Sequence, residues 1–355
     1  MKKDKALPPG VFAKGRWYYR VIAQGEKRIW KKLTLQREGI PALYRKLAQL
    51  ADFEIAPDRM PTLVEDWKRE VGSALAKRTQ ESDAWLLGVI SVAFAEFRAQ
   101  DVDPPTVAEF LGKWKTKRRT HNALRSKLLE LMRFAEEKGF RPAGSNPVAS
   151  VKRVSTPPRT TYITDSQLRR VKVAAIYGDD GLRTRSGPML CEILNLAYLT
   201  GQRVTDVLEL RWSKQAAMDE RGVVAAAYIS QDGLHFKPSK TAGSTGAMVL
   251  IAWTPRLEAV IARIKAIGRR HLTHVITTQD AQPYTYWGVN SAWQRALRRA
   301  GIKSIMLRDL RAKAITDKDD QEGLQAANTM GAHATERQTL DYIRRRKAKK
   351  TKATR

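Results

Sequence analysis

The chain has 355 residues, and its 65 Lys and Arg against 36 Asp and Glu give a formal net charge of +29. A basic surplus of this size favours a polyanionic partner, either nucleic acid or an anionic membrane surface. The sequence has no long apolar run and no signal-peptide pattern, which disfavours the membrane. A hydrophobic content of 43% supports packed cores in two or three domains, and the single cysteine, Cys191, excludes an internal disulfide and fits a reducing cytoplasm.

The first part of the chain, residues 1–55, is predicted to form a small β unit that leads into a helix. Segments 15–22 and 29–35 are rich in β-branched and aromatic residues, and a Gln-Gly-Glu turn lies between them. Pro41 then begins a helix over 42–53, because proline is favoured at the first helical position.

Residues 60–152 are predicted to be helical throughout. Apolar residues recur at three-and-four spacing over 85–94, beginning with Trp85, and again over 124–132. The next segment, 146–159, has few large apolar residues and three prolines, a composition typical of an interdomain linker.

Basic residues of these two regions are candidates for contact with nucleic acid. The densest basic run consists of Lys113, Lys115, Lys117, Arg118 and Arg119. Such a run is often only a solvated helix face, but the overall charge favours contact with phosphates. In the β unit, Arg16 and Arg20 are the corresponding candidates, whereas the aromatic residues at 17–19 are expected to build its core.

Residues 160–345 are predicted to form a mixed, mainly helical third domain, followed by a basic tail over 346–355. Thr164 and Gln167 form a capping box at a helix start, and a buried helix is expected over 189–199. Three strands follow, over 223–229, 234–237 and 247–253. Thr254 and Pro255 begin the next helix as its cap and first residue, and helices continue to the tail.

Four side chains of this domain have the chemistry needed to attack a phosphodiester. Arg203 and Arg311 carry guanidinium groups that bind non-bridging phosphate oxygens in a bidentate manner. His333 adds an imidazole, and the hydroxyl of Tyr342 becomes a covalent nucleophile if its site activates it. A plainer explanation exists for each residue alone, since an Arg-x-x-Asp pair such as Arg203 and Asp206 is usually a surface ion pair. The ordered set is what favours phosphodiester chemistry.

The local contexts of these residues resemble those of a known family. Residues 199–210, Leu-Thr-Gly-Gln-Arg-Val-Thr-Asp-Val-Leu-Glu-Leu, are similar to the first arginine box of the tyrosine recombinases, the phage integrase family. Arg308-Asp309-Leu310-Arg311 resembles their His-x-x-Arg box. Gly331-Ala332-His333 followed by Tyr342 resembles their Leu-Gly-His segment and nucleophile, and the His-to-Tyr spacing is intact.

This resemblance implies a mainly α fold with small β elements. An N-terminal β arm-type DNA-binding domain (1–55) and a helical core-binding domain (60–152) would precede a mixed α/β, mainly helical tyrosine-recombinase catalytic domain (160–345). The implied activity is that of a site-specific recombinase, or integrase, which cuts and rejoins DNA through a 3′-phosphotyrosyl intermediate. Such an enzyme integrates or excises a mobile element such as a prophage.

The resemblance also implies a role for each matching residue. Arg203 and Arg311 would clamp the scissile phosphate and stabilise the charge of the transition state. Asp206 would orient the arginines, His333 would hydrogen-bond the phosphate, and Tyr342 would form the covalent bond.

A lysine on the β-hairpin turn would be the general acid for the leaving 5′ oxygen. Lys240 matches that position, and Lys237 is a rival because hairpin register is not fixed by the sequence.

Two departures from the family pattern stand out. Arg308 occupies the position where histidine is usual, and a guanidinium cannot act as a general base because its pKa exceeds about 12. Ala332 is inserted between the glycine and the histidine.

The implied chemistry needs no cofactor and no metal, and His271 and His274 are expected to be surface or strand-edge residues. The expected partners are double-stranded DNA attachment sites, three further copies in a homotetramer on DNA, and accessory DNA-bending and directionality factors, with no membrane. The expected location is the cytoplasm of a prokaryotic host. Two other functions stay open: a type IB topoisomerase, and an architectural DNA-binding protein that has lost catalysis.

Overall fold

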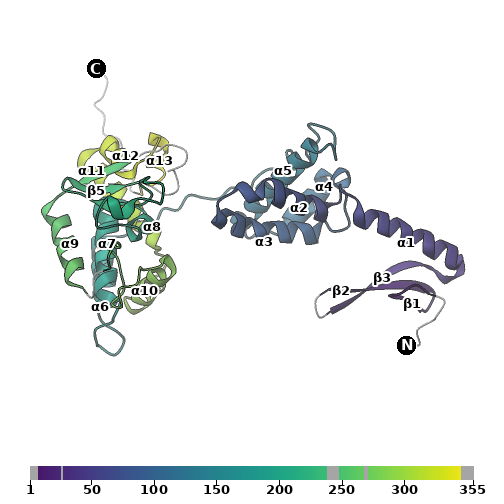
Figure 1. Ribbon diagram of the computed structural model, residues 1–355, viewed down its shortest axis with the longest axis horizontal. Coiled ribbons are helices and arrows are strands. Elements are labelled where there is room, and N and C mark those ends of the chain that lie inside the picture. Colours follow the sequence, from purple (N-terminus) through teal and green to yellow (C-terminus); the bar gives the residue numbers. More distant parts are fainter. Residues whose placement is uncertain (1–6, 25–26, 238–247, 268–270, 345–355) are drawn as a thin grey trace, which may run out of the picture. The chain divides into compact units, whose positions relative to one another are not determined.

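The computed structural model describes residues 7–24, 27–237, 248–267 and 271–344. They belong to two compact units, Met1–Pro157 and Pro158–Arg355 (Figure 1). Helices predominate, and the strands form two small antiparallel sheets, which confirms the predicted mainly α fold with small β elements. Among the described residues, no helix has the length and apolarity required to span a membrane.

The first unit begins with a three-stranded sheet followed by a helix. Its elements are β1 (Val11–Lys14), β2 (Trp17–Gln24), β3 (Lys27–Leu35) and α1 (Gly39–Ile55). Val11 and Leu33 of the sheet pack with Leu43 of α1, and Tyr18 lies against this core. Strand alternation places Trp17 and Tyr19 on the opposite face, so the prediction that residues 17–19 build the core is right only for Tyr18.

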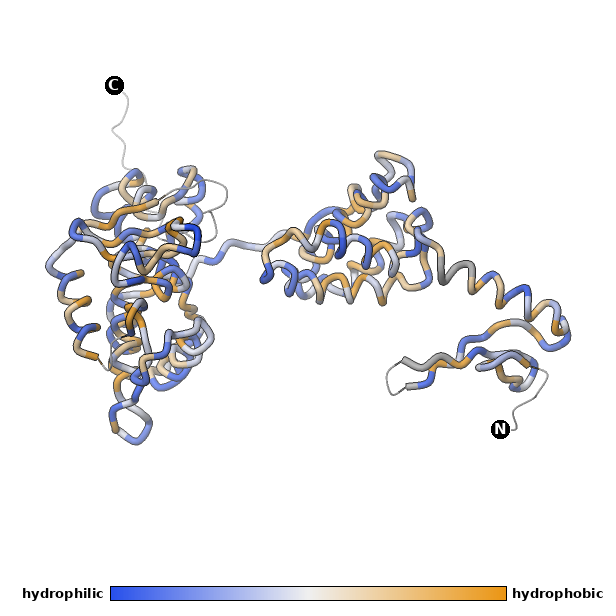
Figure 2. Tube along the Cα trace, viewed as in Figure 1, coloured by the Kyte–Doolittle hydropathy of each residue, from blue (hydrophilic) through white to orange (hydrophobic). Residues whose placement is uncertain are grey.

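Four helices complete the first unit and share one apolar core. They are α2 (Met60–Glu70), α3 (Lys77–Ala93), α4 (Pro104–Gly112) and α5 (Arg118–Glu137). Hydrophobic and hydrophilic residues alternate along them, as expected for helices that bury one face (Figure 2). On α3 the core residues include Leu87 and Ile90, whereas Trp85 is 53% exposed, so its predicted place in the buried stripe is wrong.

The predicted linker is shorter than expected because α5 holds its first part, as far as Ser155. Arg118, Asn122 and Arg125 lie on one side of α5 and donate hydrogen bonds to the carbonyl oxygens of Val148, Val151, Val154 and Ser155. Val148 is fully buried in the helical core. The chain therefore leaves the first unit after residue 155, close to the boundary at Pro157.

The second unit is built around the helix α7 (Gly187–Thr200). Its other elements are α6 (Asp165–Ile176), α8 (Val204–Leu208), β4 (Tyr228–Ile229), β5 (Gly233–Phe236), β6 (Val249–Ala252), α9 (Pro255–Ala266), α10 (Tyr286–Arg299), α11 (Leu307–Glu322), α12 (Leu324–Gly331) and α13 (Glu336–Leu340). Most residues of α7 are buried, and α6, α8, α9, α10 and α11 all contact it. The capping box of Thr164 and the cap of Thr254 form as predicted.

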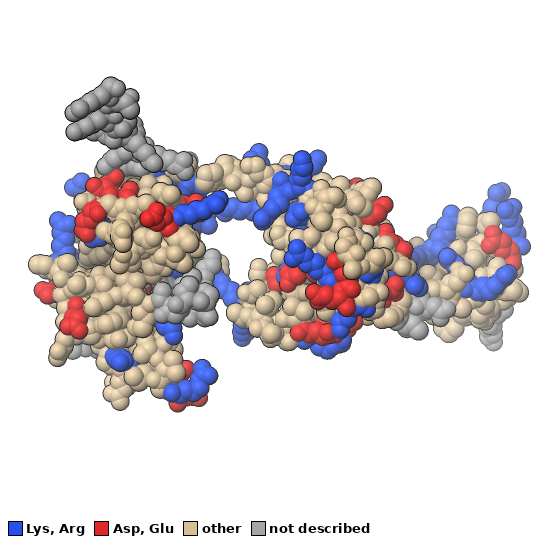
Figure 3. Space-filling view, turned by 90° about the horizontal axis from the view of Figure 1, so that it is seen from above, with Lys and Arg blue, Asp and Glu red and all other residues tan. Residues whose placement is uncertain are grey.

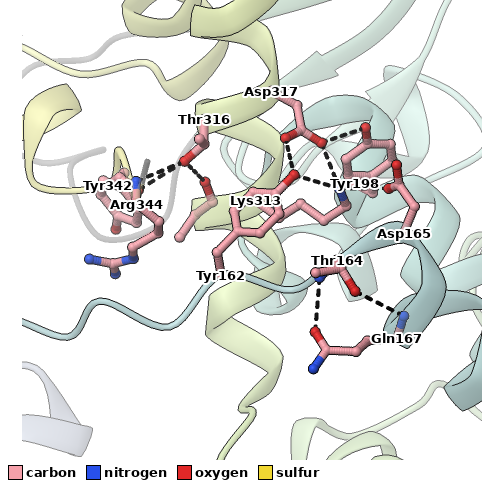
Figure 4. A network of polar contacts seen from close by, with 11 residues as sticks. Tyr162, Thr164, Asp165, Gln167, Tyr198, Lys313, Thr316, Asp317, Tyr342 and Arg344 are labelled. Carbon is pink, nitrogen blue, oxygen red and sulfur yellow. Dashed lines mark hydrogen bonds and ion pairs between the residues drawn. The ribbon is translucent and has the colours of Figure 1, made fainter. Parts of the chain in front are cut away.

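The buried Lys313 of α11 connects this helix to Tyr162 and Asp165, near the start of the second unit (Figure 4). The ammonium of Lys313, which is fully buried, lies 2.7 Å from carboxylate oxygens of both Asp165 and Asp317 and donates to the hydroxyl of Tyr162 at 3.0 Å. Burial alone would lower the pKa of Lys313, but the hydrogen bonds that it donates to Asp165, Asp317 and Tyr162 outweigh burial and raise that pKa above its ordinary value. The hydroxyl of Tyr198 also donates to Asp317, at 2.9 Å.

Replacing Lys313 with methionine should destabilise the second unit strongly. The variant leaves Asp317 without its ammonium partner inside the fold, and an unpaired buried charge costs about 3–5 kcal/mol. The matched control is Asp165→Asn, because the side chain of Asp165 is 72% exposed and its ion pair should contribute less than about 1 kcal/mol. Urea unfolding would measure both, and equal losses would contradict this account of Lys313.

Candidate active site

Arg311 lies at the centre of the cluster that the structure brings together. It projects from α11, and its side chain is buried. Its Nη1 donates to the carbonyl oxygen of Gly201 at 3.0 Å, and its Nη2 donates to that of Gly331 at 2.6 Å. Nη2 also lies 3.1 Å from Nε2 of His333. One guanidinium therefore joins α11 to the C-terminal ends of α7 and α12.

Glycine is required at both of these carbonyl positions. Gly201 ends α7 with a φ of 66°, and a Cβ there would lie 3.0 Å from the side chain of Met330. A Cβ on Gly331 would lie 2.7 Å from the imidazole of His333. The inserted Ala332 takes the left-handed conformation that ends α12, with a φ of 47°, so the extra residue is absorbed in the helix cap and His333 still reaches the cluster.

Arg203 and Asp206 form the second part of the cluster, at the start of α8. Nη1 of Arg203 lies 3.6 Å from Oδ2 of Asp206, whose side chain is only 3% exposed. Nη1 of Arg203 and Nε of Arg311 are buried nitrogens that have no hydrogen-bond acceptor among the described residues. Buried donors of this kind are normally paired, so both suit an anion bound at the cluster.

The electrostatics of the cluster also favour an anion. Burial, followed by the charge of Arg203, lowers the pKa of Arg311 to about 10, and Tyr342 and Asp206 oppose this shift. Arg311 is therefore still charged at neutral pH. Two neighbouring guanidinium groups repel each other, and a bound anion would relieve that repulsion.

His333 is held between Arg311 and α13. Its Nδ1 lies 2.9 Å from Oγ1 of Thr339, and its Nε2 faces Arg311. Burial first, and then the charges of Arg311 and Arg203, lower the pKa of His333 to about 4. The imidazole is consequently neutral at neutral pH.

Tyr342 lies beside these groups, directly after α13. Its ring stacks on the imidazole of His333, with ring centroids 5.0 Å apart and an interplanar angle of 18°. The Cζ atom of Arg311 is 5.3 Å from the centroid of the same ring. The backbone N–H of Tyr342 donates to the carbonyl oxygen of Thr339 at 2.9 Å. Tyr342 thus lies in the cluster formed by its own chain.

The structure describes two of the three remaining residues predicted for the site. Arg308 is exposed on α11, one turn before Arg311. Lys240 lies outside the described residues. Its rival Lys237, just after β5, donates from Nζ to the carbonyl oxygen of Val224 at 3.2 Å.

Gln202 belongs to the site, although the sequence assigned it no role. Its Nε2 donates to the carbonyl oxygen of Met330 at 2.7 Å, and its Oε1 lies 3.4 Å from Nη1 of Arg311. In the sequence, its position inside the first arginine box was the signal that could have marked it as a site residue.

A second group of contacts that the sequence did not reveal anchors the chain on both sides of Tyr342. The backbone N–H of Arg344 donates to Oγ1 of Thr316 on α11 at 3.0 Å, and that hydroxyl lies 3.4 Å from the carbonyl oxygen of Tyr342 (Figure 4). The guanidinium of Arg344 donates to the carbonyl oxygen of Arg159, whose own guanidinium pairs with Asp309 at 2.6 Å. These contacts join the segment around Tyr342 to the start of the unit.

The basic run of the first unit is exposed at the junction of α4 and α5, as expected for phosphate contact. All five predicted residues, Lys113, Lys115, Lys117, Arg118 and Arg119, are exposed. On the face shown in Figure 3, basic side chains of this unit gather at its linker end, apart from most of its acidic ones. Arg118 also donates to the carbonyl oxygen of Ser155 at 3.3 Å, so it has a structural contact as well.

The two arginines predicted for the β unit differ in position. Arg16 is exposed in the turn between β1 and β2. Arg20 pairs across the sheet with Val11, which places it on the face covered by α1. On the open face, the ammonium of Lys32 lies 3.7 Å from the ring centroid of Trp17, and that of Lys14 lies 5.6 Å from the ring centroid of Trp30. Strand pairing places both lysines on this face, since Lys14 pairs with Trp17 and Lys32 with Tyr19.

Comparison with known proteins agrees with this geometry. The model of the phage integrase family matches residues 161–349, more than half of the chain. The chain belongs to the phage integrase family. It is therefore a recombinase that binds, cleaves and rejoins DNA. No match was found among curated protein sequences.

Solved structures of other integrases share the fold. A lambda integrase dimer bound to a COC′ core site superimposes with a TM-score of 0.66 at 17% identity, covering 99% of this chain and 100% of that one. A lambda integrase tetramer bound to a Holliday junction gives 0.64 at 17% identity, covering 94% and 97%. The Tn1549 transposon integrase (residues 82–397) with circular intermediate DNA gives 0.60 at 12% identity, covering 81% and 96%.

The low pKa of His333 predicts a pH dependence of stability. The folded imidazole takes up its proton only near pH 4, whereas the unfolded one does so near 6.5. Between these values the unfolded state binds more protons, so the free energy of unfolding should fall as the pH is lowered through this window. NMR titration of the imidazole would test the shift directly. Arg203→Gln should raise the pKa of His333, and a wild-type value near 6.5 would contradict the described environment.

Proposed function

We propose that this integrase is site-specific and uses Tyr342 as its nucleophile, forming a 3′-phosphotyrosyl intermediate to integrate or excise a mobile element such as a prophage. The observation that carries the proposal is the cluster of Arg203, Arg311, His333 and Tyr342. Segments far apart in the sequence bring the guanidinium of Arg311 next to the ring of Tyr342, and Arg203 and Arg311 each have a buried nitrogen without a hydrogen-bond acceptor among the described residues.

In the proposed step, Oη of Tyr342 attacks the scissile phosphorus as the bond from phosphorus to the 5′ oxygen breaks. Arg203 and Arg311 stabilise the added charge on the non-bridging oxygens. Lys240 gives a proton to the departing 5′ oxygen. The phosphotyrosyl bond keeps the bond energy, so attack by a 5′ hydroxyl reverses the step without a cofactor.

The proton of Tyr342 has to leave by a route that does not use residue 308. Arg308 is exposed and permanently charged, so it cannot accept that proton. The imidazole of His333 stacks on the ring of Tyr342 and points its two nitrogens at Arg311 and Thr339. We propose that water removes the proton, while Asp206 orients Arg203.

The proposed organisation follows the similar integrases. Residues 1–55 would form the arm-type domain, 60–152 the core-binding domain and 160–345 the catalytic domain, with a basic tail at 346–355 that lies outside the described residues. Because lambda integrase structures include a dimer on a core site and a tetramer on a Holliday junction, we propose a homotetramer on double-stranded attachment sites. Accessory DNA-bending and directionality factors would act with it in a prokaryotic host cell. A repeat shared between the gene's flanking DNA and the host chromosome would identify the element.

Tyr342→Phe should abolish covalent capture of DNA without weakening binding. A nicked suicide substrate carrying the attachment site should trap wild-type protein on the 3′ side of the break, since the fragment beyond the nick diffuses away. The variant keeps the ring that stacks on His333 and lacks only the attacking oxygen. Gel analysis of the adduct gives the readout, and an adduct formed by the variant would assign the nucleophile to another residue. Relaxation of any supercoiled plasmid without strand exchange would instead indicate a topoisomerase.

Lys115→Ala with Lys117→Ala should weaken binding to all DNA sequences alike. Each lost phosphate contact should reduce the slope of log K against log salt by about 1. Arg118 is left in place because it also holds Ser155. Lys138→Ala, at the opposite end of α5, is the matched control and should leave the slope unchanged. An unchanged slope in the double variant would remove the junction of α4 and α5 from the interface.

A further inference from the structure

Thr339 connects two groups of the proposed active site, although its sequence position suggests only a helix residue. It lies in the last turn of α13, and its side chain is fully buried. Its Oγ1 is 2.9 Å from Nδ1 of His333. Its carbonyl oxygen accepts the backbone N–H groups of Tyr342, at 2.9 Å, and Ile343, at 3.2 Å. One residue thus fixes both the imidazole and the backbone of the nucleophile.

The neighbours of His333 determine where its proton lies. Nη2 of Arg311 is 3.1 Å from Nε2 of His333, and a guanidinium has donors only. Nε2 must therefore accept, which puts the proton of the neutral imidazole on Nδ1. Nδ1 then donates to the hydroxyl oxygen of Thr339.

A bound phosphate requires the opposite tautomer. To donate to a phosphate oxygen, His333 needs its proton on Nε2, and Nδ1 then needs a donor of its own. A threonine hydroxyl can both accept and donate, so Thr339 can serve either tautomer. When His333 passes from one tautomer to the other, Nδ1 releases one proton to water and Nε2 takes one from water, so the net charge of the imidazole does not change. Arg311 meanwhile moves its Nη2 donor from the imidazole to the phosphate.

We propose that Thr339 is a positioning residue that holds the ring of His333 through this exchange of tautomers while it fixes the backbone of Tyr342. The proposal rests on the proposed function. It is supported by the 2.9 Å contact between the buried hydroxyl and Nδ1, and by the neutral state of His333 in the DNA-free protein at neutral pH.

Nitrogen-15 NMR of the histidine side chains tests the exchange directly in the full chain. The free protein should show His333 with its proton on Nδ1. Tyr342→Phe bound to attachment-site duplex, which holds the scissile phosphate uncleaved, should show the proton on Nε2. A proton on Nδ1 in both states would overturn the proposed exchange, and this measurement does not depend on the folding of any Thr339 variant.

Cleavage kinetics test the positioning role. Thr339→Val keeps the shape of the side chain and removes the hydroxyl, so single-turnover cleavage of the suicide substrate should slow by about tenfold while the Kd for DNA stays the same. Thr339→Ser should restore the rate to within about twofold. The control is Thr184→Val, because the hydroxyl of Thr184 bonds only backbone groups before α7, at 2.6 Å to the carbonyl oxygen of Ala175 and 2.9 Å from the N–H of Gly187.

The outcomes separate this proposal from the proposed function. Wild-type cleavage by Thr339→Val, or no recovery with Thr339→Ser, would overturn the role of Thr339. An adduct formed by Tyr342→Phe in the same assay would overturn the assignment of the nucleophile instead.

Discussion

Burial of the Arg311 guanidinium is the constraint on which the rest of the site depends. A buried charge of this kind must have its donors satisfied, and here the carbonyl oxygens of Gly201 and Gly331 satisfy two of them. Those carbonyl groups lie at the C-terminal ends of α7 and α12. Each helix therefore has to end at this point for its carbonyl oxygen to accept a hydrogen bond from Arg311. The left-handed caps that end the helices therefore position the carbonyl groups that hold Arg311.

The same burial explains why neighbouring groups act together. Burial is the largest cause of the low pKa of His333, and the charges of Arg311 and Arg203 lower it further. The charge of Arg203 also lowers the pKa of Arg311, again after burial as the largest cause. The cluster is therefore a region of concentrated positive charge around a neutral imidazole. Repulsion between these charges disfavours the DNA-free protein. The same charges favour an anion that accepts hydrogen bonds from both arginines, as expected of a preorganised anion site.

Much of this was accessible from the sequence, and the limits have physical causes. Arg203, Arg311, His333 and Tyr342 were predicted from short segments with a family-like spacing, and the structure brings these segments together. Thr339 contacts His333 through a single hydroxyl, which leaves no pattern in the residue order, and Gln202 was marked only by its place in the first arginine box.

Periodicity predicted the elements better than it predicted their faces. Two small sheets among helices were expected, but β1 was not predicted as a strand, and the strand predicted over 223–229 is limited to Tyr228–Ile229. The stripe on α3 was placed one position off at Trp85. In the β unit, the register of β1 with β2 decided that Tyr18 points to α1 while its two neighbours do not. The linker was predicted too long because Asn122 and Arg125 of α5 bind its backbone. In the sequence these polar residues cannot be told from ordinary solvent-exposed ones.

The short linker has a consequence for target choice. Ser155 is held by α5 and Arg159 by Asp309, so only Thr156, Pro157 and Pro158 remain between two anchored points. Consecutive prolines favour the extended polyproline conformation, with a rise of about 3.1 Å per residue. If both units contact DNA, as proposed, three residues set the greatest distance that the chain allows between Ser155 and Arg159. A change in the number of these residues would then alter which spacings of DNA contacts the protein can reach.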